Sequence, residues 1–230
     1  MIIQIFGTRG EIKAHAHKHL KHSGILIDNK ILIDVGEPEY LKYKPEFILI
    51  THFHPDHAFF IREKNKINIT LPVFAPEATN KISGVTIISS TVKMDSYLIT
   101  PVPTIHSMKV KSQGYIIEKN KRRIFYSGDL VTIEKKYYRE LGKLDLVITE
   151  GSFIRRGGVV RQHVETKKLF GHAGIPDLIS LFEKFTHRII FTHFGTWFMK
   201  DVVAAKEKIK PLEKKQLTLE IAEDGKKYNV

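Results

Sequence analysis

Four side chains that can bind a metal ion lie within six consecutive residues of this sequence. They are His52, His54, Asp56 and His57. The preceding residues, 47–50, are almost wholly apolar and predict a buried strand. In extended backbone, residues two apart share a face, so the first two histidines can bind one cation side by side. Pro55 then turns the chain and suits the start of a helix, which directs the next two ligands inward. The segment therefore predicts a metal site at the end of a strand.

Short strands and amphipathic helices are predicted in alternation along the chain. Strands are expected at residues 2–6, 24–28, 31–35, 47–51, 85–89, 97–102, 115–118, 124–127, 144–149, 188–192 and 217–221. Helices are expected after Pro55, at 175–182 and at 202–209. This order predicts an α/β protein in which two sheets are covered by helices.

Length and composition describe one globular domain, residues 1–230, with 42% hydrophobic and 27% charged residues. Cysteine is absent, which excludes a disulfide framework, thiolate zinc sites and a catalytic thiol. No apolar run reaches the ~18 residues of a membrane helix, and the first residues lack the basic flank of a signal peptide. We therefore expect a cytoplasmic protein that does not contact a membrane.

The formal net charge of +12 favours an anionic substrate, such as RNA or another phosphodiester. A lysine-rich surface that only keeps the protein in solution is the alternative. The oligomeric state has no readable signature, and a homodimer remains open.

The run from His52 to His57 resembles the His-x-His-x-Asp-His signature of the metallo-β-lactamase superfamily, whose fold is an αββα sandwich. Three later segments resemble other parts of that family's pattern, and they contain His106, Asp129 and His193. Asp34 lies in a further matching segment, where a structural hydrogen-bonding role is expected. The resemblance covers nearly the whole chain and implies an αββα four-layer sandwich.

The resemblance also implies two metal ions in one centre. The ligands would be His52, His54 and His106 for one ion, Asp56, His57 and His193 for the other, and Asp129 as the bridge between them. Zn²⁺ suits imidazole and carboxylate ligands best, and Mn²⁺ or Fe²⁺ is also compatible. Two divalent cations lower the pKa of a bridging water, so that hydroxide is available near neutral pH.

The segment Gly171-His172-Ala173-Gly174 indicates the reaction. It resembles the ribonuclease Z branch and its phosphodiesterase relatives, in which the equivalent histidine lies beside the scissile phosphate. We therefore expect His172 to protonate the leaving oxygen and Asp56 to orient or deprotonate the water. A loop histidine without a role is the alternative for His172. The 23 positions between His106 and Asp129 leave no room for the tRNA-clamping arm of ribonuclease Z.

These features together predict a dinuclear metal-dependent hydrolase, most consistent with a phosphodiesterase or nuclease. Two alternatives remain: a thioester or lactone hydrolase of the same superfamily, and a basic nucleic-acid-binding protein with a structural metal site. The histidine-rich segment 15–22 is expected to be a mobile, substrate-facing rim rather than a third metal site. Segment 155–163 is expected to be either a substrate-binding flap or a flexible surface loop. Trp197 and Phe198 are expected to pack in the core.

Overall fold

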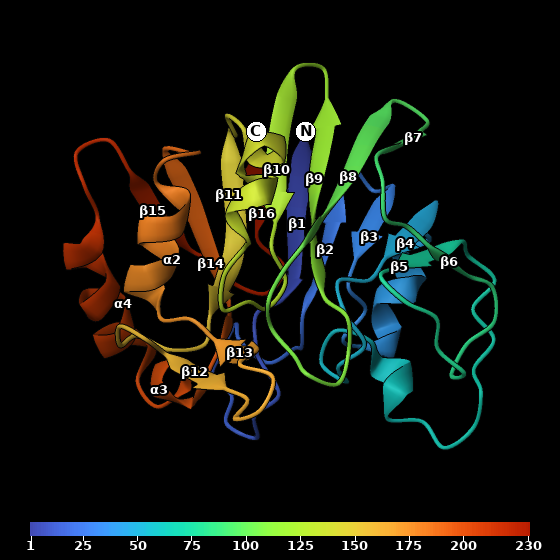
Figure 1. The fold of residues 1–230 in the computed structure, drawn as a ribbon, viewed down its shortest axis with the longest axis horizontal. Coiled ribbons are helices and arrows are strands. Elements are labelled where there is room, and N and C mark those ends of the chain that lie inside the picture. Colours follow the sequence, from blue (N-terminus) through green and yellow to red (C-terminus); the bar gives the residue numbers. More distant parts are fainter.

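The computed structural model describes residues 1–230 and contains two seven-stranded sheets that pack face to face (Figure 1). The first sheet has the strand order β16 (Lys227–Asn229), β1 (Ile2–Gly7), β2 (Gly24–Ile27), β3 (Ile31–Ile33), β4 (Phe47–Leu49), β5 (Val73–Ala75), β6 (Val85–Ile87). The second has the order β15 (Thr218–Ile221), β14 (Arg188–Phe194), β11 (Leu146–Gly151), β10 (Arg122–Tyr126), β9 (Gln113–Lys119), β8 (Tyr97–Pro103), β7 (Val92–Met94). A separate two-stranded sheet pairs β12 (Val159–Gln162) with β13 (Leu169–His172).

Alternating apolar side chains bury both faces of the central strands. In β2, Ile25 and Ile27 point between the sheets, whereas Leu26 joins the core on the outer face of the first sheet. In β11, Ile148 likewise lies between the sheets and Val147 faces the opposite side. Because successive side chains of a strand point to opposite faces, each of these strands contributes to two cores.

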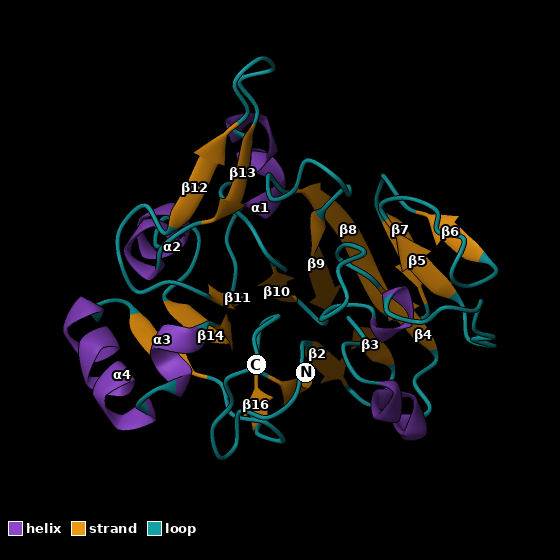
Figure 2. Ribbon diagram, turned by 90° about the horizontal axis from the view of Figure 1, so that it is seen from below, coloured by secondary structure: helices purple, strands orange, loops and turns teal.

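The outer faces of the two sheets are covered in different ways. The α-helices are α1 (Tyr138–Leu141), α2 (Ile175–Phe182), α3 (Thr196–Met199) and α4 (Val202–Ile209). The 3₁₀ helices are η1 (Pro38–Tyr43), η2 (Phe59–Ile61), η3 (Lys135–Tyr137) and η4 (Lys210–Leu212). Figure 2 shows α2, α3 and α4 beyond the second sheet, where Phe182 packs in one core with Phe125. On the first sheet, η1 and η2 bury Tyr40 and Phe60 instead. None of the helices is long and apolar enough to cross a membrane.

The layer order confirms the expected αββα fold class, and every expected strand is present with its ends shifted by at most two residues. The helix expected after Pro55 is wrong. Only the single turn η2 forms there, because Val35 pairs with this segment: its N–H donates to His57 O and its carbonyl accepts from Phe59 N. The very short strands β5, β7 and β16 were not predicted, because three residues carry too little of a period-two pattern.

The strands of the second sheet bring their carboxyl ends to one edge. β10, β11 and β14 are parallel to one another, and β8 runs in the same direction because two antiparallel pairings separate it from β10. The segments that follow these strands therefore meet at the lower edge of the molecule in Figure 1. This edge carries the residues for which chemistry was predicted.

The histidine-rich segment 15–22 is not the mobile rim that was expected. His19 is buried against Phe194 and Phe198, and burial lowers the pKa of its imidazole to about 4. His22 is also buried and accepts a hydrogen bond from the Arg9 guanidinium at 3.0 Å. Apolar neighbours thus bury His19, and charged neighbours surround the buried His22, while His15 and His17 stay exposed.

Asp224 ties this segment to the last strands. Its carboxylate accepts hydrogen bonds from the Thr8 hydroxyl at 2.7 Å and from the Leu20 and Lys21 N–H groups at 2.7 and 3.0 Å. We expect Asp224→Ala to lower the free energy of unfolding by about 2–3 kcal/mol, as measured by urea denaturation, because hydrogen bonds to a charged acceptor are lost. The control Asp95→Asn removes an exposed ion pair with Lys30 and keeps a residue type that tolerates the positive φ of 52° at this position, so it should lower the free energy of unfolding far less. Equal losses of unfolding free energy in the two variants would contradict the role of the Asp224 carboxylate in holding this segment to the last strands.

Candidate metal centre

All seven predicted ligand residues converge in one buried cluster at this edge. Four overlapping groups of candidate ligand atoms form, each with its atoms within 4.8 Å of one another, and two of them together contain all seven residues. The first contains His52, His54, His106 and Asp129, and the second contains Asp56, His57, His193 and Asp129. Asp129 belongs to both of these groups, as expected of a bridging carboxylate. The other two groups are Asp129, Glu150, His172 and His193, and Glu11, His22 and Asp56.

The first group holds three ring nitrogens at hydrogen-bond distance, although one proton cannot serve both contacts. His54 Nδ1 lies 3.0 Å from His52 Nε2 and 3.1 Å from His106 Nε2, and Asp129 Oδ2 is 3.8 Å from both of those Nε2 atoms. His54 Nδ1 carries at most one proton, so it cannot donate a hydrogen bond to both Nε2 atoms. Ligands of a tetrahedral zinc site at about 2.0–2.1 Å would be about 3.3 Å apart, so the spacing fits a cation at their centre.

The second group leaves polar atoms unpaired in the interior. His57 Nε2 and Asp129 Oδ1 are 3.3 Å apart, yet both are buried and neither has a hydrogen-bond partner. Asp56 Oδ2 is 2.8 Å from His193 Nε2 and 3.8 Å from His57 Nε2. Because buried unpaired polar atoms are costly, a cation between these atoms fits the site that the side chains form.

Hydrogen bonds behind the cluster orient the rings. Nδ1–H of His57 donates to Asp34 at 2.7 Å, and Nδ1–H of His106 donates to Gly171 O at 2.9 Å. Ser152 Oγ lies 3.0 Å from His193 Nδ1 and donates its proton to the His193 carbonyl at 3.2 Å. In His57 and His106 these bonds occupy Nδ1, so Nε2 is the nitrogen that faces the cluster. In His193 both nitrogens lie near carboxylates, with Nε2 2.8 Å from Asp56 Oδ2 and Nδ1 3.3 Å from Asp129 Oδ1.

The protonation states also suit metal binding. Burial lowers the pKa of His54 to about 4 and that of His52 well below the usual value. Burial alone would lower the pKa of His57, but the carboxylates of Asp129, Asp34 and Asp56 raise it well above the usual value. Burial alone would raise the pKa of Asp129, but His193 and His57 lower it well below the usual value. The cluster therefore offers ionised carboxylates and, in the first group, neutral imidazoles, the forms that bind cations.

His172 lies at the end of β13, beside this cluster. Its Nδ1–H donates to Glu150 Oε2 at 2.8 Å, and Nε2 has no partner in the protein. Burial would lower the pKa of His172, but the Glu150 carboxylate raises it to about 9. Sequence reasoning missed Glu150 and Ser152, although both follow the predicted strand 144–149 at the edge where the ligands gather.

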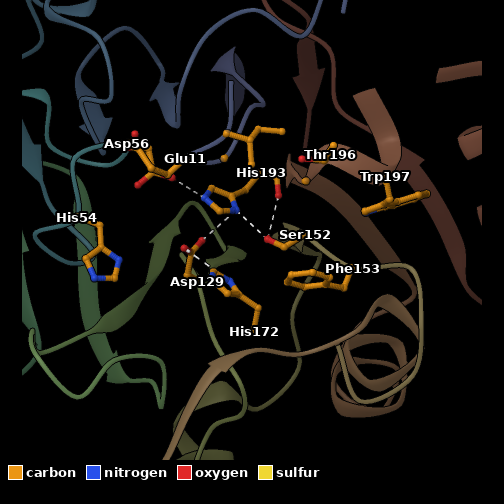
Figure 3. Close-up of a pocket in the computed structure, with 13 residues that line it drawn as sticks. Glu11, His54, Asp56, Asp129, Ser152, Phe153, His172, His193, Thr196 and Trp197 are labelled. Atoms are coloured by element: carbon orange, nitrogen blue, oxygen red, sulfur yellow. Dashed lines mark hydrogen bonds and ion pairs between the residues drawn. The ribbon is translucent and has the colours of Figure 1, made fainter. Parts of the chain in front are cut away.

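The cluster opens into a cavity of about 350 Å³ (Figure 3). The cavity is lined by five candidate metal-binding or catalytic side chains and by three apolar ones. They are His54, Asp56, Asp129, His172 and His193, and Ile12, Phe153 and Trp197. The indole N–H of Trp197 donates to Gly151 O at 3.1 Å, which fixes the ring at the wall of the cavity. The expectation of core packing is confirmed for Phe198, which is fully buried, and for Trp197, which is partly buried and packs against the same core while its ring also lines the cavity.

Segment 155–163 forms part of an ordered hairpin rather than a flexible loop. Within it, β12 pairs antiparallel with β13, and Val159 lies opposite His172. The Arg155 guanidinium donates to Gly158 O at 3.0 Å and closes the turn before β12. The hairpin therefore holds the backbone of His172 beside the cluster.

Comparison with known proteins gives the same fold. The sequence model of the Beta-lactamase superfamily domain matches residues 36–194. The metallo-β-lactamase fold protein YhfI from Bacillus subtilis superposes with a TM-score of 0.70 at 15% identity, covering 99% of each chain. A diphosphatase of the PhnP family has a TM-score of 0.70 at 17% identity, covering 100% of this chain and 97% of its own. Human tRNase Z, short form (ELAC1), has a TM-score of 0.63 at 15% identity, covering 100% and 99%. No curated protein matches significantly in sequence.

The variant Asp34→Asn tests whether the hydrogen bonds that orient the His57 ring matter for metal binding. The Asp34 backbone has a positive φ of 59°, which asparagine also tolerates, so Asp34→Asn should fold. The amide cannot accept from Thr51 N–H and hydroxyl and from His57 Nδ1–H together, because one of its ends is a donor. We expect metal affinity, measured by calorimetric titration of the metal-depleted protein, to fall about 10–100-fold.

The matched control is Asp28→Asn, since Asp28 bonds Ile2 N–H, Tyr97 and Lys119 and no metal-ligand candidate. It should leave the affinity unchanged. Wild-type affinity in Asp34→Asn would show that the His57 ring is held by packing alone.

Proposed function

This chain belongs to the β-lactamase superfamily of metal-dependent hydrolases, and we propose that it is a dinuclear phosphodiesterase that acts as a nuclease. The observation that carries the proposal is the Asp129 carboxylate, which lines an open cavity and belongs to both groups that contain the seven candidate ligands. A site that served only stability would be closed on all sides, whereas this one leaves room for a substrate.

The two cations would be held by the residues of the two ligand groups. His52, His54 and His106 would bind one ion, Asp56, His57 and His193 would bind the other, and Asp129 would bridge them. We propose Zn²⁺, because imidazole nitrogens and carboxylate oxygens at tetrahedral spacing suit it best, while Mn²⁺ or Fe²⁺ is also compatible. When bound, the ions activate water for nucleophilic attack and offset the negative charge of the substrate.

The reaction class is inferred from what lies beside the ligands. His172 is held by Glu150 with Nε2 free, in the place of a proton donor to a leaving group. The formal charge of +12 attracts an anionic substrate to the site. Of the superfamily's substrate classes, a phosphodiester is the anionic one whose leaving alcohol needs a proton.

The proposed reaction is hydrolysis of one phosphate ester bond. Water adds its oxygen to phosphorus, and the bond from phosphorus to the leaving oxygen breaks. His172 gives the Nε2 proton to that oxygen and regains one from water, so the products are a phosphomonoester and an alcohol. Asp56 orients the attacking water, and Glu150 positions the His172 ring through Nδ1.

Asp129→Ala distinguishes a catalytic centre from a structural metal site. We expect hydrolysis of bis(p-nitrophenyl) phosphate to fall more than about 100-fold, because losing even a supporting partner of a ligand costs about 10–100-fold. The circular dichroism spectrum should remain native, since the sheets are held by cores away from the cluster. The control Asp95→Ala, an exposed position, should retain full activity.

Two outcomes would contradict the proposal. A large fall in Tm for Asp129→Ala, with no hydrolysis by the wild-type protein, would favour a nucleic-acid-binding protein with a structural metal. Hydrolysis of a thioester or lactone, with phosphodiesters left intact, would favour another branch of the superfamily.

His172→Ala tests the proton donor through the leaving group. A nucleoside alcohol must be protonated as it leaves, whereas p-nitrophenolate leaves without a proton. We expect kcat for a dinucleotide to fall about 10²–10⁴-fold, and kcat for bis(p-nitrophenyl) phosphate to change far less. Equal losses on both substrates would assign His172 to substrate or metal binding instead.

A further inference from the structure

A second cavity borders the metal centre on the side of His106. Its volume is about 780 Å³, more than twice that of the cavity that contains the ligands. It is lined chiefly by the loop that joins β8 to β9, residues 104–112, and by the first residues of β13. We call this cavity the lysine groove, after Lys109, Lys111 and Lys168, which line it.

The lysine groove starts at the metal centre itself. His106 and Gly171 are joined by two hydrogen bonds, from Gly171 N–H to His106 O at 2.7 Å and from His106 Nδ1–H to Gly171 O at 2.9 Å. On one side of this junction the chain continues as residues 107–111, and on the other lie Lys168 and Leu169. The walls of the groove therefore meet at a candidate ligand.

The charge of the groove is not neutralised by the protein. All three lysines are exposed and none forms an ion pair. Two carboxylates also line the groove. Glu134 pairs with Lys136 at 2.6 Å, whereas Glu77 accepts the Lys111 backbone N–H at 2.9 Å and keeps its negative charge, so the three lysines leave the groove with a net positive charge. The lysine ammonium groups are thus free to meet anions from outside.

Apolar side chains alternate with the lysines along the same wall. Met108 and Val110 flank Lys109, and Leu169 follows Lys168. Met108 and Leu169 are 40% and 37% exposed, so they present apolar surface to whatever enters. A surface that combines separate cations with apolar contacts matches a chain of phosphates that carries sugars and bases.

We propose that the lysine groove binds the strand of a single-stranded nucleic acid next to the scissile phosphate. This inference rests on the proposed function and narrows its substrate from any phosphodiester to an oligonucleotide. A single strand is favoured over a duplex, because six of the seven candidate ligands are at most 5% exposed and a stacked, paired backbone cannot reach them. The smaller cavity with Phe153 and Trp197 then receives the residue on the other side of the cut.

The test is binding of a fluorescent, phosphorothioate-linked oligothymidylate, which resists cleavage, to the metal-loaded full chain. Lys109→Gln combined with Lys111→Gln should weaken binding about tenfold at low salt. It should also reduce the slope of log affinity against log salt by about 1.4, since each phosphate contact on a single strand contributes about 0.7. An uncharged methylphosphonate oligothymidylate should not bind measurably.

The matched control removes the same charge elsewhere. Lys93 and Lys121 are exposed and unpaired, and they lie in β7 and in the turn before β10, at the opposite ends of the strands from His106 and Asp129. Lys93→Gln combined with Lys121→Gln should change affinity and salt slope little. Equal weakening by both double variants would overturn the proposal, because it would show attraction to the net charge alone. Unchanged oligothymidylate affinity after Lys109→Gln combined with Lys111→Gln would overturn the proposal as well.

The binding assay needs no turnover, so the two proposals can fail separately. If oligothymidylate binds in the lysine groove but no phosphodiester is hydrolysed, the proposed nuclease activity is refuted and the proposed binding site is supported. If bis(p-nitrophenyl) phosphate is hydrolysed but Lys109→Gln combined with Lys111→Gln leaves oligonucleotide affinity unchanged, the proposed binding site is refuted and the phosphodiesterase activity is supported.

Discussion

The structure depends on keeping two buried carboxylates among five imidazole rings. Asp56 and Asp129 are almost completely buried, and taking ionised carboxylates out of water is costly unless opposite charge compensates for them. His193 and His57 offset part of this cost, since they lower the pKa of Asp129, yet Asp129 Oδ1 has no hydrogen-bond partner. Two cations would relieve this arrangement. The proposed metal centre would therefore account for the polarity of the site.

The rigidity of the centre follows from where its residues are placed. Asp129 and His193 follow or end strands buried on both faces, and His106 lies three residues after β8. His193 itself has a positive φ of 50°, an unfavourable conformation that the flanking hydrogen bond from Phe194 N–H to Thr8 O helps to hold. Because Asp224 fixes Thr8 in turn, the end of the chain contributes to the position of a ligand.

Much of this centre was predictable because its signals are local. The spacing from His52 to His57 predicts candidate ligands directly, and each later candidate follows a strand that its apolar residues predict. Glu150 was missed because a single carboxylate after a strand has no distinctive spacing, and its role depends on a hairpin that brings His172 to it. The buried state of His19 was unpredictable for a related reason. Its neighbours Phe194 and Phe198 are distant in sequence, and only tertiary packing turns a polar run into core.

The hairpin of β12 and β13 forms a sheet of its own, separate from the two that carry the metal ligands. Its strands supply His172 and Leu169, whereas its turn, residues 163–168, includes Val164, which is 80% exposed. The hairpin is thus a structural unit separate from the two large sheets. Residues at that turn can therefore be added or replaced without altering the two sheets that position the candidate metal ligands.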